Sequence, residues 1–443
     1  MIDHKILREK IQDKTARLAI IGLGYVGLPV AALFAEAGFD VTGIEKRDDR
    51  VEQINNGLCP IEGDEPGLPE LLKKVVKSGR LRATTNYQNL EDREVILIDV
   101  ETPVDEHNVP QYKALRSALT KLAPVMMDGA LVIVESTIAP GTMRDVVVPM
   151  LEEESGGKLN QDFYLGNCPE RVMPGKLIKN LKTVNRVVGG MTPGTADLMV
   201  ALYRQIVEAE LDPTDCITAE LVKTTENAYR DVQIAFANEV ALICEAVGGD
   251  VWKVRELVNK SPGRQMHLPG AGVGGHCIPK DPWLLAYSVK DKKVPLRLIP
   301  AARQINDSMP QHMIDLLIDA LRKAGRELKG ARIAVLGYAY LEDSDDTRNS
   351  PSAELVRILH NLGAQTVIHD PWVKEYESDL YERIRGCDAV VVMVAHSAYR
   401  RIDLNKLDLA LQIPLVLDGR RLFEIGSGRN YDGIYRCMGV NQT

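Results

Sequence analysis

The chain has 443 residues, of which 45% are hydrophobic and 26% charged, and its formal net charge is -8. This length exceeds one ordinary core and predicts a soluble globular protein of two or three domains. The acidic balance argues against a general attraction to nucleic acid or anionic membranes, no segment is apolar over the length of a transmembrane helix, and the seven cysteines lack the spacing of a disulfide framework or zinc site.

The N-terminal residues 1–14 carry charges without an apolar run between them. A signal peptide requires such a run, so this segment does not have the pattern of one. We expect a short solvated helix that leads into the first strand, and a cytoplasmic protein.

An internal repeat predicts the fold class. The run RLAIIG at 17–22 recurs as RIAVLG at 332–337, and in each half a helical stretch and a second strand follow. Each second strand ends in an acid seven residues after a glycine, at Glu45 and at Asp370. Third strands are expected at 94–100 and 388–396. The pattern predicts an α/β protein with two Rossmann-like, doubly wound parallel sheets.

A segment of helical character, roughly residues 206–310, separates the two repeats. Its apolar residues recur at spacings of three and four, and Gly248-Gly249 supplies a stop for one helix. We expect three domains, at 1–205, 206–310 and 311–443, with the central helices joining the sheets and forming a homodimer or higher homo-oligomer.

A glycine-rich turn follows the first strand and opens a helix. Gly22, Gly24 and Gly27 have the spacing that allows a tight turn, close approach of a pyrophosphate and packing of helix on strand. Glu45 lies where the fingerprint places the acceptor for an adenosine ribose, which favours NAD over NADP. Lys46 and Arg47 beside it leave NADP open, and a purely structural turn is the alternative.

The corresponding turn of the second repeat, Gly337-Tyr-Ala-Tyr-Leu, lacks the second and third glycines. We expect it not to bind a pyrophosphate in the same manner, although the sheet edge could hold another nucleotide. Arg348 nearby offers a bidentate donor suited to phosphate. A surface ion pair of Arg348 with Asp345 or Asp346 is equally compatible with the sequence.

The most unusual stretch, residues 270–282, contains four glycines within six residues and then Cys277. The glycines would let the backbone approach a ligand. Cationic neighbours and backbone donors favour a thiolate, which is the nucleophilic form, and His276, Lys280 and Asp281 flank this cysteine. A buried, inert cysteine in a glycine turn is the alternative.

Further polar groups are expected near a site. Lys223 and Asn227 are four residues apart, so they share one helix face. Their side chains could hydrogen-bond to a reacting hydroxyl and to its developing oxyanion. A solvated helix edge is the alternative. Glu135 and the pair Glu170-Arg171 each follow an apolar, strand-like run. Their side chains should emerge at a sheet edge.

Together these motifs resemble the UDP-glucose/GDP-mannose dehydrogenase family from about residue 15 to 435. The matching runs, all in family order, are GLGYVGLP (22–29), Thr102-Pro103, ESTIAPGT (135–142), CPERV (168–172), KTTEN (223–227), GVGGHCIPKDP (272–282), NDSMP (306–310) and DDTRNSP (345–351). The resemblance implies an N-terminal NAD domain, a central helical dimerisation domain and a C-terminal domain for the nucleotide of a UDP-sugar.

The resemblance also implies a four-electron oxidation of a sugar C6 alcohol to a carboxylate. Lys223, Asn227 and Asp281 would organise a water or the emerging oxyanion during the first oxidation. Cys277 would then attack the aldehyde to form a thiohemiacetal, which becomes a thioester on the second oxidation. Water directed by Glu170 or Asp281 would release the product.

The resemblance assigns binding residues as well. The cofactor contacts it implies are Gly22, Gly24, Tyr25, Val26, Gly27, Glu45, Arg50, Thr102, Pro103, Glu135, Thr137, Lys280 and Arg348. The substrate contacts it implies are Arg171, Val172, Lys223, Asn227, Gly274 and His276. No metal is implied.

Within the family, the run CPERVMPGK and the position of His276 resemble the branch acting on UDP-N-acetylmannosamine or UDP-N-acetylglucosamine. Two positions depart from UDP-glucose enzymes: Pro174 replaces a glutamate and Leu341 replaces a lysine. A UDP-glucose or GDP-mannose 6-dehydrogenase, a 3-hydroxyacid dehydrogenase and a non-catalytic nucleotide-sugar sensor are the alternatives.

Overall fold

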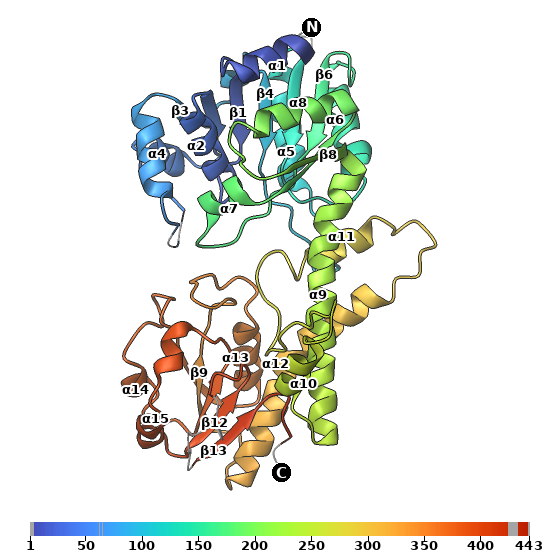
Figure 1. Cartoon of the computed structure of the whole chain (residues 1–443). Helices are drawn as coiled ribbons and strands as arrows, with labels where there is room; N and C mark the ends of the chain where they lie inside the picture. The colour runs from blue at the N-terminus through green and yellow to red at the C-terminus, as the bar shows by residue number, and fades with distance from the viewer. Residues whose placement is uncertain (1–3, 62, 64, 424–432, 442–443) are drawn as a thin grey trace. The chain divides into compact units, whose positions relative to one another are not determined.

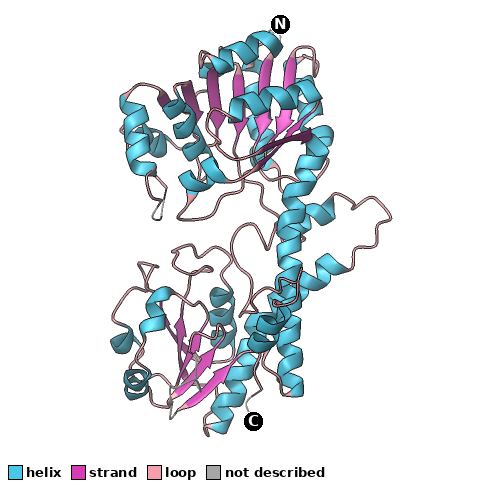
Figure 2. Cartoon of the chain, viewed as in Figure 1, coloured by secondary structure: helices cyan, strands magenta, loops and turns pink. Residues whose placement is uncertain are grey.

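The structure is a computed structural model that describes residues 4–61, 63, 65–423 and 433–441. Its residues form two compact units, the first comprising Met1–Glu226 and Trp283–Lys293 and the second Asn227–Pro282 and Val294–Thr443. The central segment contributes to both units, so the domain boundaries at 205 and 310 stay a prediction. Each unit is built around one sheet (Figures 1 and 2).

Within the described residues, the sheet of the first unit has eight strands in the order β3-β2-β1-β4-β5-β6-β7-β8. All neighbouring pairs are parallel except β6 with β7, so the prediction of a parallel sheet holds with one antiparallel pair. The strands are β1 (Arg17–Ile21), β2 (Asp40–Ile44), β3 (Leu81–Thr84), β4 (Val95–Ile98), β5 (Ala130–Val134), β6 (Phe163–Asn167), β7 (Arg186–Gly190) and β8 (Leu211–Asp215).

Helices cover both faces of this sheet because successive strand residues point to opposite faces (Figure 1). Leu18 and Ile20 join a core with α1, α2, α4 and α8, whereas Ala19 and Ile21 join another with α5 and α6. The helices are α1 (His4–Gln12), α2 (Gly27–Ala37), α3 (Asp48–Asn55), α4 (Leu68–Lys77), η1 (Tyr87–Leu90), α5 (Lys113–Leu122), η2 (Ala123–Val125), the π-helical turn η3 (Met143–Val147), α6 (Val148–Ser155), α7 (Leu177–Thr183) and α8 (Pro193–Tyr203).

The N-terminal helix is present, as α1, but the expectation that it is solvated is wrong. Leu7 and Ile11 are fully buried in the core of the first unit. Lys10 forms an ion pair with buried Glu94 at the start of β4. The helix is amphipathic, and its four-residue spacing of apolar side chains docks it on the sheet.

The second unit carries a parallel sheet in the order β10-β9-β11-β12-β13 within the described residues. Its strands are β9 (Arg332–Leu336), β10 (Gln365–His369), β11 (Ala389–Val392), β12 (Leu415–Asp418) and β13 (Ile434–Cys437). Its helices are α10 (Val251–Val258), α12 (Leu298–Lys323), α13 (Pro351–Asn361), α14 (Leu380–Arg383), η4 (Ser397–Arg401) and α15 (Leu404–Ala410). Two parallel sheets, one in each unit, confirm the predicted fold class.

Two helices run from one unit into the other, α9 (Cys216–Val247) and α11 (Asp281–Tyr287). The predicted stop of α9 is confirmed, because Gly248 adopts φ 87° and the helix ends before it. The expectation of helix from residue 206 is wrong at its start, where β8 pairs with β7. Among the described residues, no helix is long and apolar enough to cross a membrane.

The internal repeat extends to individual hydrogen bonds. Gly22 N–H donates to Ile44 O at 2.8 Å, and Gly337 N–H donates to His369 O at 2.9 Å. The first residue of each repeat makes an equivalent bond to the acid that precedes the third strand. The backbone N–H of Arg17 donates to Glu94 at 2.9 Å, and that of Arg332 donates to Asp388 at 2.7 Å. Glu45 and Asp370 therefore occupy equivalent places.

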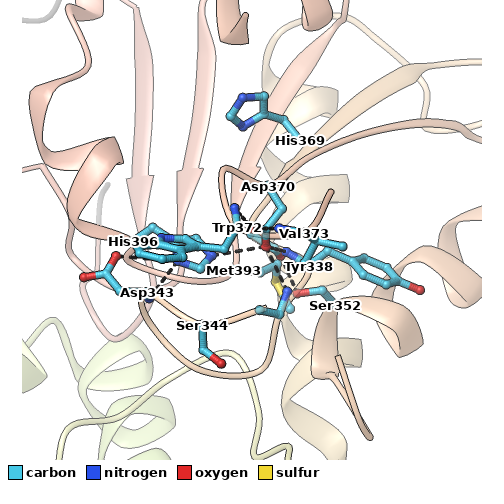
Figure 3. A network of polar contacts seen from close by, with 12 residues as sticks. Tyr338, Asp343, Ser344, Ser352, His369, Asp370, Trp372, Val373, Met393 and His396 are labelled. Atoms are coloured by element: carbon cyan, nitrogen blue, oxygen red, sulfur yellow. Dashed lines mark hydrogen bonds and ion pairs between the residues drawn. The ribbon is translucent and has the colours of Figure 1, made fainter. Parts of the chain in front are cut away.

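In the second repeat, Asp370 fills the turn that a phosphate would occupy in a dinucleotide site (Figure 3). Its Oδ2 accepts the backbone N–H groups of Tyr338 at 2.6 Å and Ala339 at 2.9 Å, which follow Gly337. Its Oδ1 accepts those of Trp372 and Val373. The chain's own carboxylate thus uses the donors of the turn, which gives a physical reason why this turn need not bind a pyrophosphate.

A buried histidine completes the surroundings of Asp370. The backbone N–H of Asp343 donates to His396 Nδ1 at 2.9 Å, so Nδ1 is an acceptor and Nε2 carries the proton. Nε2 then donates to Asp370 at 3.1 Å. Burial would raise the pKa of Asp370, but the hydrogen bonds from His396 and the backbone lower it to about 2.

We expect Asp370→Asn to destabilise the protein by about 3 kcal/mol at neutral pH, because an amide cannot accept all of these donors. The pKa of this carboxyl is lowered in the folded state, so its contribution is present above pH 4 and is lost as the pH falls toward 2. Urea unfolding at pH 7 and pH 3 measures the difference. Asp403→Asn, at an exposed helix N-cap of the same unit, is the control; an equal loss in both variants would contradict the assignment.

Candidate active site

The predicted cradle has the geometry of a dinucleotide turn. Gly22 adopts φ +100°, and a Cβ there would lie 2.3 Å from Asp99 O; a Cβ at Gly27 would lie 2.0 Å from Gly22 O. These two glycines are required by the packing of strand, turn and helix. A Cβ at Gly24 would meet nothing within 4 Å, so open space lies over the turn, as close approach of a phosphate requires. No side chain caps the N-terminus of α2 at Val26.

Glu45 is buried at the end of β2, in the place that a ribose-binding acid takes. It accepts the backbone N–H of Arg47 at 3.1 Å and faces Arg50 Nε at 3.4 Å. Arg50 also donates to Leu23 O in the cradle at 2.9 Å. Arg50 therefore braces both the turn and the acid, and ribose binding by Glu45 stays a prediction.

Tyr25 connects the cradle to the loop after β6. Its hydroxyl donates to buried Glu65, whose carboxylate also accepts the N–H groups of Gly175 at 2.7 Å and Leu177 at 3.2 Å. One carboxylate thus joins the predicted cofactor turn to the loop that follows the predicted substrate residues Arg171 and Val172. Glu65 was not singled out in the sequence, where it lies in an ordinary polar loop.

The segments after β4 and β5 are joined side by side. The hydroxyl of buried Thr102 donates to Thr137 O, and Pro103 O accepts the N–H of Gln111 at 2.8 Å. Glu220 of α9 fixes the following loop, because it accepts the N–H groups of Gly141 at 2.7 Å and Met143 at 2.8 Å. Burial raises the pKa of Glu220 to about 7. Lys223 lies one helical turn further along α9.

Glu135 and Glu170 point into a buried polar cluster. Arg186, at the start of β7, forms an ion pair with Glu170 and lies 3.7 Å from Glu135 Oε1. Tyr203 donates to the same Glu135 oxygen at 2.6 Å. Burial raises the pKa of Glu170 to about 7, while Arg186 and Lys223 oppose the shift. An acid with a pKa near neutrality suits general base catalysis.

The residues that follow Glu170 are held by α9 and by the core. Arg171 donates to Glu226 at 2.9 Å and to Asn185 O at 2.8 Å. Val172 packs against the hydrophobic core of the first unit. Their contact with a substrate stays a prediction.

In the second unit, a buried acid links two predicted catalytic residues. Asp281 is fully buried, and its Oδ2 accepts a hydrogen bond from Asn227 Nδ2 at 2.5 Å. Lys280 Nζ lies 2.8 Å from its Oδ1. One carboxylate thus orients an amide and an ammonium group, and its charge is offset by that of Lys280.

Cys277 precedes this cluster. All seven cysteines lie in the described part of the chain: five are buried, Cys59 is partly buried and Cys277 is exposed. The alternative of a buried cysteine is therefore wrong for Cys277. Burial and the charges of Lys280 and Arg348 lower the pKa of His276, which favours a neutral imidazole beside the thiol.

The glycines before Cys277 also serve packing within the second unit, and their approach to a ligand stays a prediction. A Cβ at Gly274 would lie 2.6 Å from Tyr340 Cβ, and one at Gly275 2.7 Å from the ring of the same tyrosine. Gly275 N–H also donates to Arg348 O at 2.9 Å. In the second unit these glycines admit the 340–351 segment, which fixes the backbone that carries the thiol.

Arg348 takes the ion-pair arrangement that the sequence left open. Its guanidinium contacts both carboxylate oxygens of Asp346, with Nε at 2.9 and 3.1 Å. Its backbone N–H donates to the same side chain at 3.0 Å. A role of Arg348 toward the cofactor stays a prediction.

The five predicted catalytic residues therefore fall into two groups. Glu170 and Lys223 belong to the first unit, and Asn227, Cys277 and Asp281 to the second. The structure adds residues that the sequence analysis missed: Glu65, Asp99, Arg186, Tyr203 and Glu220. Asp99 and Arg186 could have been found as charged residues within or beside apolar strand runs.

Comparison with known proteins places all three parts of the chain in one family. Residues 16–207 match the NAD binding domain of the UDP-glucose/GDP-mannose dehydrogenase family, residues 217–308 its central domain, and residues 334–425 its UDP binding domain. The first match agrees with the open turn at Gly24 and identifies the cofactor as NAD.

Individual relatives match over more than nine tenths of the chain. A UDP-N-acetyl-D-mannosamine dehydrogenase of Pyrococcus horikoshii is 40% identical over 408 residues, which are 92% of this chain and 96% of the relative. A solved structure of UDP-D-ManNAc dehydrogenase from Pyrococcus horikoshii superposes with a TM-score of 0.90 at 39% identity, covering 96% of this chain and 99% of that one. The NDP-N-acetyl-D-galactosaminuronic acid dehydrogenase of Methanosarcina mazei Go1 gives 0.85 at 36% identity, with 98% of each chain covered.

The recognised motifs, the two-sheet fold, the open glycine turn and these matches agree. The chain belongs to the UDP-glucose/GDP-mannose dehydrogenase family and is an NAD-dependent nucleotide-sugar dehydrogenase.

Proposed function

We propose that the chain oxidises the C6 alcohol of a UDP-N-acetylhexosamine to the uronate. UDP-N-acetylmannosamine is the first candidate substrate. The observation that carries the proposal is the exposed thiol of Cys277 beside the Asn227–Asp281–Lys280 cluster, because a one-step alcohol oxidation would need no nucleophile. Relatives named for N-acetylated sugars support the substrate class. NAD, when bound, accepts a hydride in each of the two oxidations.

The first oxidation requires a group that receives the proton of the alcohol and stabilises the oxygen. Lys223 and Asn227 lie one helical turn apart on α9, and Asp281 orients the amide of Asn227. We assign these three residues to the C6 oxygen or to a water bound to it. Fixed donors of this kind stabilise a developing oxyanion more than the neutral alcohol.

Covalent catalysis by Cys277 explains the second oxidation. Its thiolate adds to the C6 aldehyde, and the oxygen takes up a proton to give a thiohemiacetal. Oxidation of this adduct leaves a thioester. Water then adds to the thioester carbon, the C–S bond breaks, and the thiolate departs. Glu170, with its pKa near 7, is the base that deprotonates this water.

The stoichiometry of NADH distinguishes this function from its alternatives. With UDP-N-acetylmannosamine we expect two NADH per sugar and a uronate product, measured by absorbance and mass spectrometry. UDP-N-acetylglucosamine, UDP-glucose, GDP-mannose and 3-hydroxyacids complete the panel. One NADH per hydroxyacid would indicate a 3-hydroxyacid dehydrogenase, and sugar binding without any NADH would indicate a sensor.

Substitution of the nucleophile tests the covalent step. We expect Cys277→Ser to reduce turnover by roughly three orders of magnitude, because the hydroxyl is a poorer nucleophile without an activated partner. NAD affinity, measured by calorimetry, should change less than twofold. Cys244→Ser, at a buried cysteine of α9, is the matched control. Loss of NAD binding in Cys277→Ser alone would show that the residue is structural.

We also propose a homodimer formed through α9. Tyr229, Phe236, Ile243 and Val247 recur at seven- and four-residue spacings on this helix and are 53–77% exposed. Apolar side chains at these spacings lie along one face, and a second copy of the same helix offers a complementary stripe.

A charge within this stripe should separate the copies. We expect the double variant Phe236→Glu/Ile243→Glu to elute as a monomer in light scattering coupled to gel filtration, since two carboxylates would be buried at the interface. Leu409→Glu, at an apolar residue that is 89% exposed elsewhere, should leave the assembly unchanged. An unaltered oligomer in the α9 variant would exclude this face.

A further inference from the structure

The buried cluster behind Glu170 contains more acids than bases. It gathers three carboxyl groups from the ends of neighbouring strands: Asp99 after β4, Glu135 after β5 and Glu170 after β6. Arg186 is the buried cation among them, and Lys223 of α9 adds a second positive charge on the side of Glu170. Full ionisation would bury three negative charges around one guanidinium, which is costly in a low-dielectric core.

The contact between Asp99 and Glu135 is the place where a bound proton would neutralise one of the three negative charges. Their carboxyl groups lie within hydrogen-bonding reach of each other. Asp99 Oδ2 and Glu135 Oε2 are buried and accept from no donor among the described residues. Two carboxylates cannot form a hydrogen bond without a proton between them, so the contact requires one of the pair to be protonated.

With one proton on this pair, the charges balance. The pair then carries a single negative charge and Glu170 another, against the positive charges of Arg186 and Lys223. The neighbouring groups on the other packed elements, the thiol of Cys168 and the hydroxyl of Tyr203, are both neutral because burial raises their pKa. Burial also raises the pKa of Asp99 to about 7 and raises that of Glu135 well above its ordinary range, in agreement with a shared proton at neutral pH.

Arg186 connects the pair to Glu170. Its guanidinium forms an ion pair with Glu170 and lies 3.7 Å from Glu135 Oε1, where Tyr203 also donates. The negative charge of the pair acts on Glu170 in the direction opposite to that of Arg186. A change in the charge of the pair therefore acts electrostatically on Glu170, the base of the proposed hydrolysis. Neither Asp99 nor Glu135 needs to touch the substrate for this effect.

We propose that Asp99 and Glu135 share one proton and act as a positioning pair for Glu170, their single negative charge setting the pH range over which Glu170 can deprotonate water. The proposal rests on the hydrolytic role proposed for Glu170. It predicts a particular pattern among variants: removal of either acid leaves the charge on the other, whereas removal of both abolishes it.

The shared proton is tested first, by infrared difference spectra of each variant against the wild type at pH 7 without substrate, in which the bands of Glu170 and Glu220, whose pKa values lie at about 7, cancel. We expect the wild-type protein to show the C=O stretch of a protonated carboxyl group. Asp99→Asn and Glu135→Gln should each lose this band, because the introduced amide donates to the remaining carboxylate and no proton is needed. Glu94→Gln should retain it. Glu94 is a matched control, since it is as buried as Glu135 but lies at the other end of β4, paired with Lys10.

The effect on Glu170 is tested by the pH dependence of thioester hydrolysis. Quenched single turnovers followed by mass spectrometry of the Cys277 adduct give the rate. In the wild type this rate should fall below about pH 7, since Glu170 must be ionised to act as the base. In Asp99→Asn/Glu135→Gln, the acidic limb should move to lower pH by about one unit, so that at pH 6 the variant keeps about five times more of its plateau rate.

The single variants and Glu94→Gln should leave the limb near its wild-type position. The proposal is overturned if the double variant, folded by circular dichroism, keeps the wild-type limb, or if Glu94→Gln shifts it equally. If the double variant does not fold, the infrared bands of the single variants decide: persistence of the band in both excludes a shared proton. Failure of the wild type to form any Cys277 adduct would instead refute the proposed function, while the infrared result would still stand.

Discussion

The cost of burying a carboxylate governs the carboxyl ends of the strands in both units. Such a group must be surrounded by donors, paired with a cation or kept protonated. The chain uses all three solutions: Asp370 is enclosed by backbone N–H groups and a histidine, Asp281 at the start of α11 is paired with Lys280 and Asn227, and Asp99 lies beside another acid with which we propose that it shares a proton. The three carboxyl groups therefore differ in which protons and hydrogen bonds they can still exchange with a ligand.

These differences distinguish the two repeats of the folding unit. In the first, Glu45 contacts Arg47 and Arg50, and the open turn at Gly24 is available to a cofactor. In the second, the equivalent acid, Asp370, accepts hydrogen bonds from the backbone N–H groups of the turn itself. The strand order around both turns is the same, and the equivalent bonds from Gly22 and Gly337 are retained. The two turns therefore differ in the hydrogen bonds of one side chain each, Glu45 and Asp370, and not in the order of the surrounding strands.

Local patterns in the sequence predicted the repeat, the main strands, the stop after α9 and the glycine turn, because each depends on residues close together in the chain. The buried cluster could not be predicted in this way. Asp99, Glu135, Arg186 and Tyr203 come from four elements up to 104 positions apart, and only the strand order β4-β5-β6-β7 brings them together. Likewise, the glycines near Cys277 suggested ligand access, yet their closest neighbours belong to a segment some 65 residues later.

The enclosed carboxylate of Asp370 has a consequence for how nucleotide sites are found. A search by glycine fingerprint detects the cofactor turn at residues 22–27 and passes over the second sheet, although residues 334–425 match a UDP binding domain. An internal acid there has replaced the ligand's anionic group as the partner of the turn. The amides of Tyr338 and Ala339 are consequently occupied by the chain itself, so recognition of a second nucleotide by that domain has to use other groups.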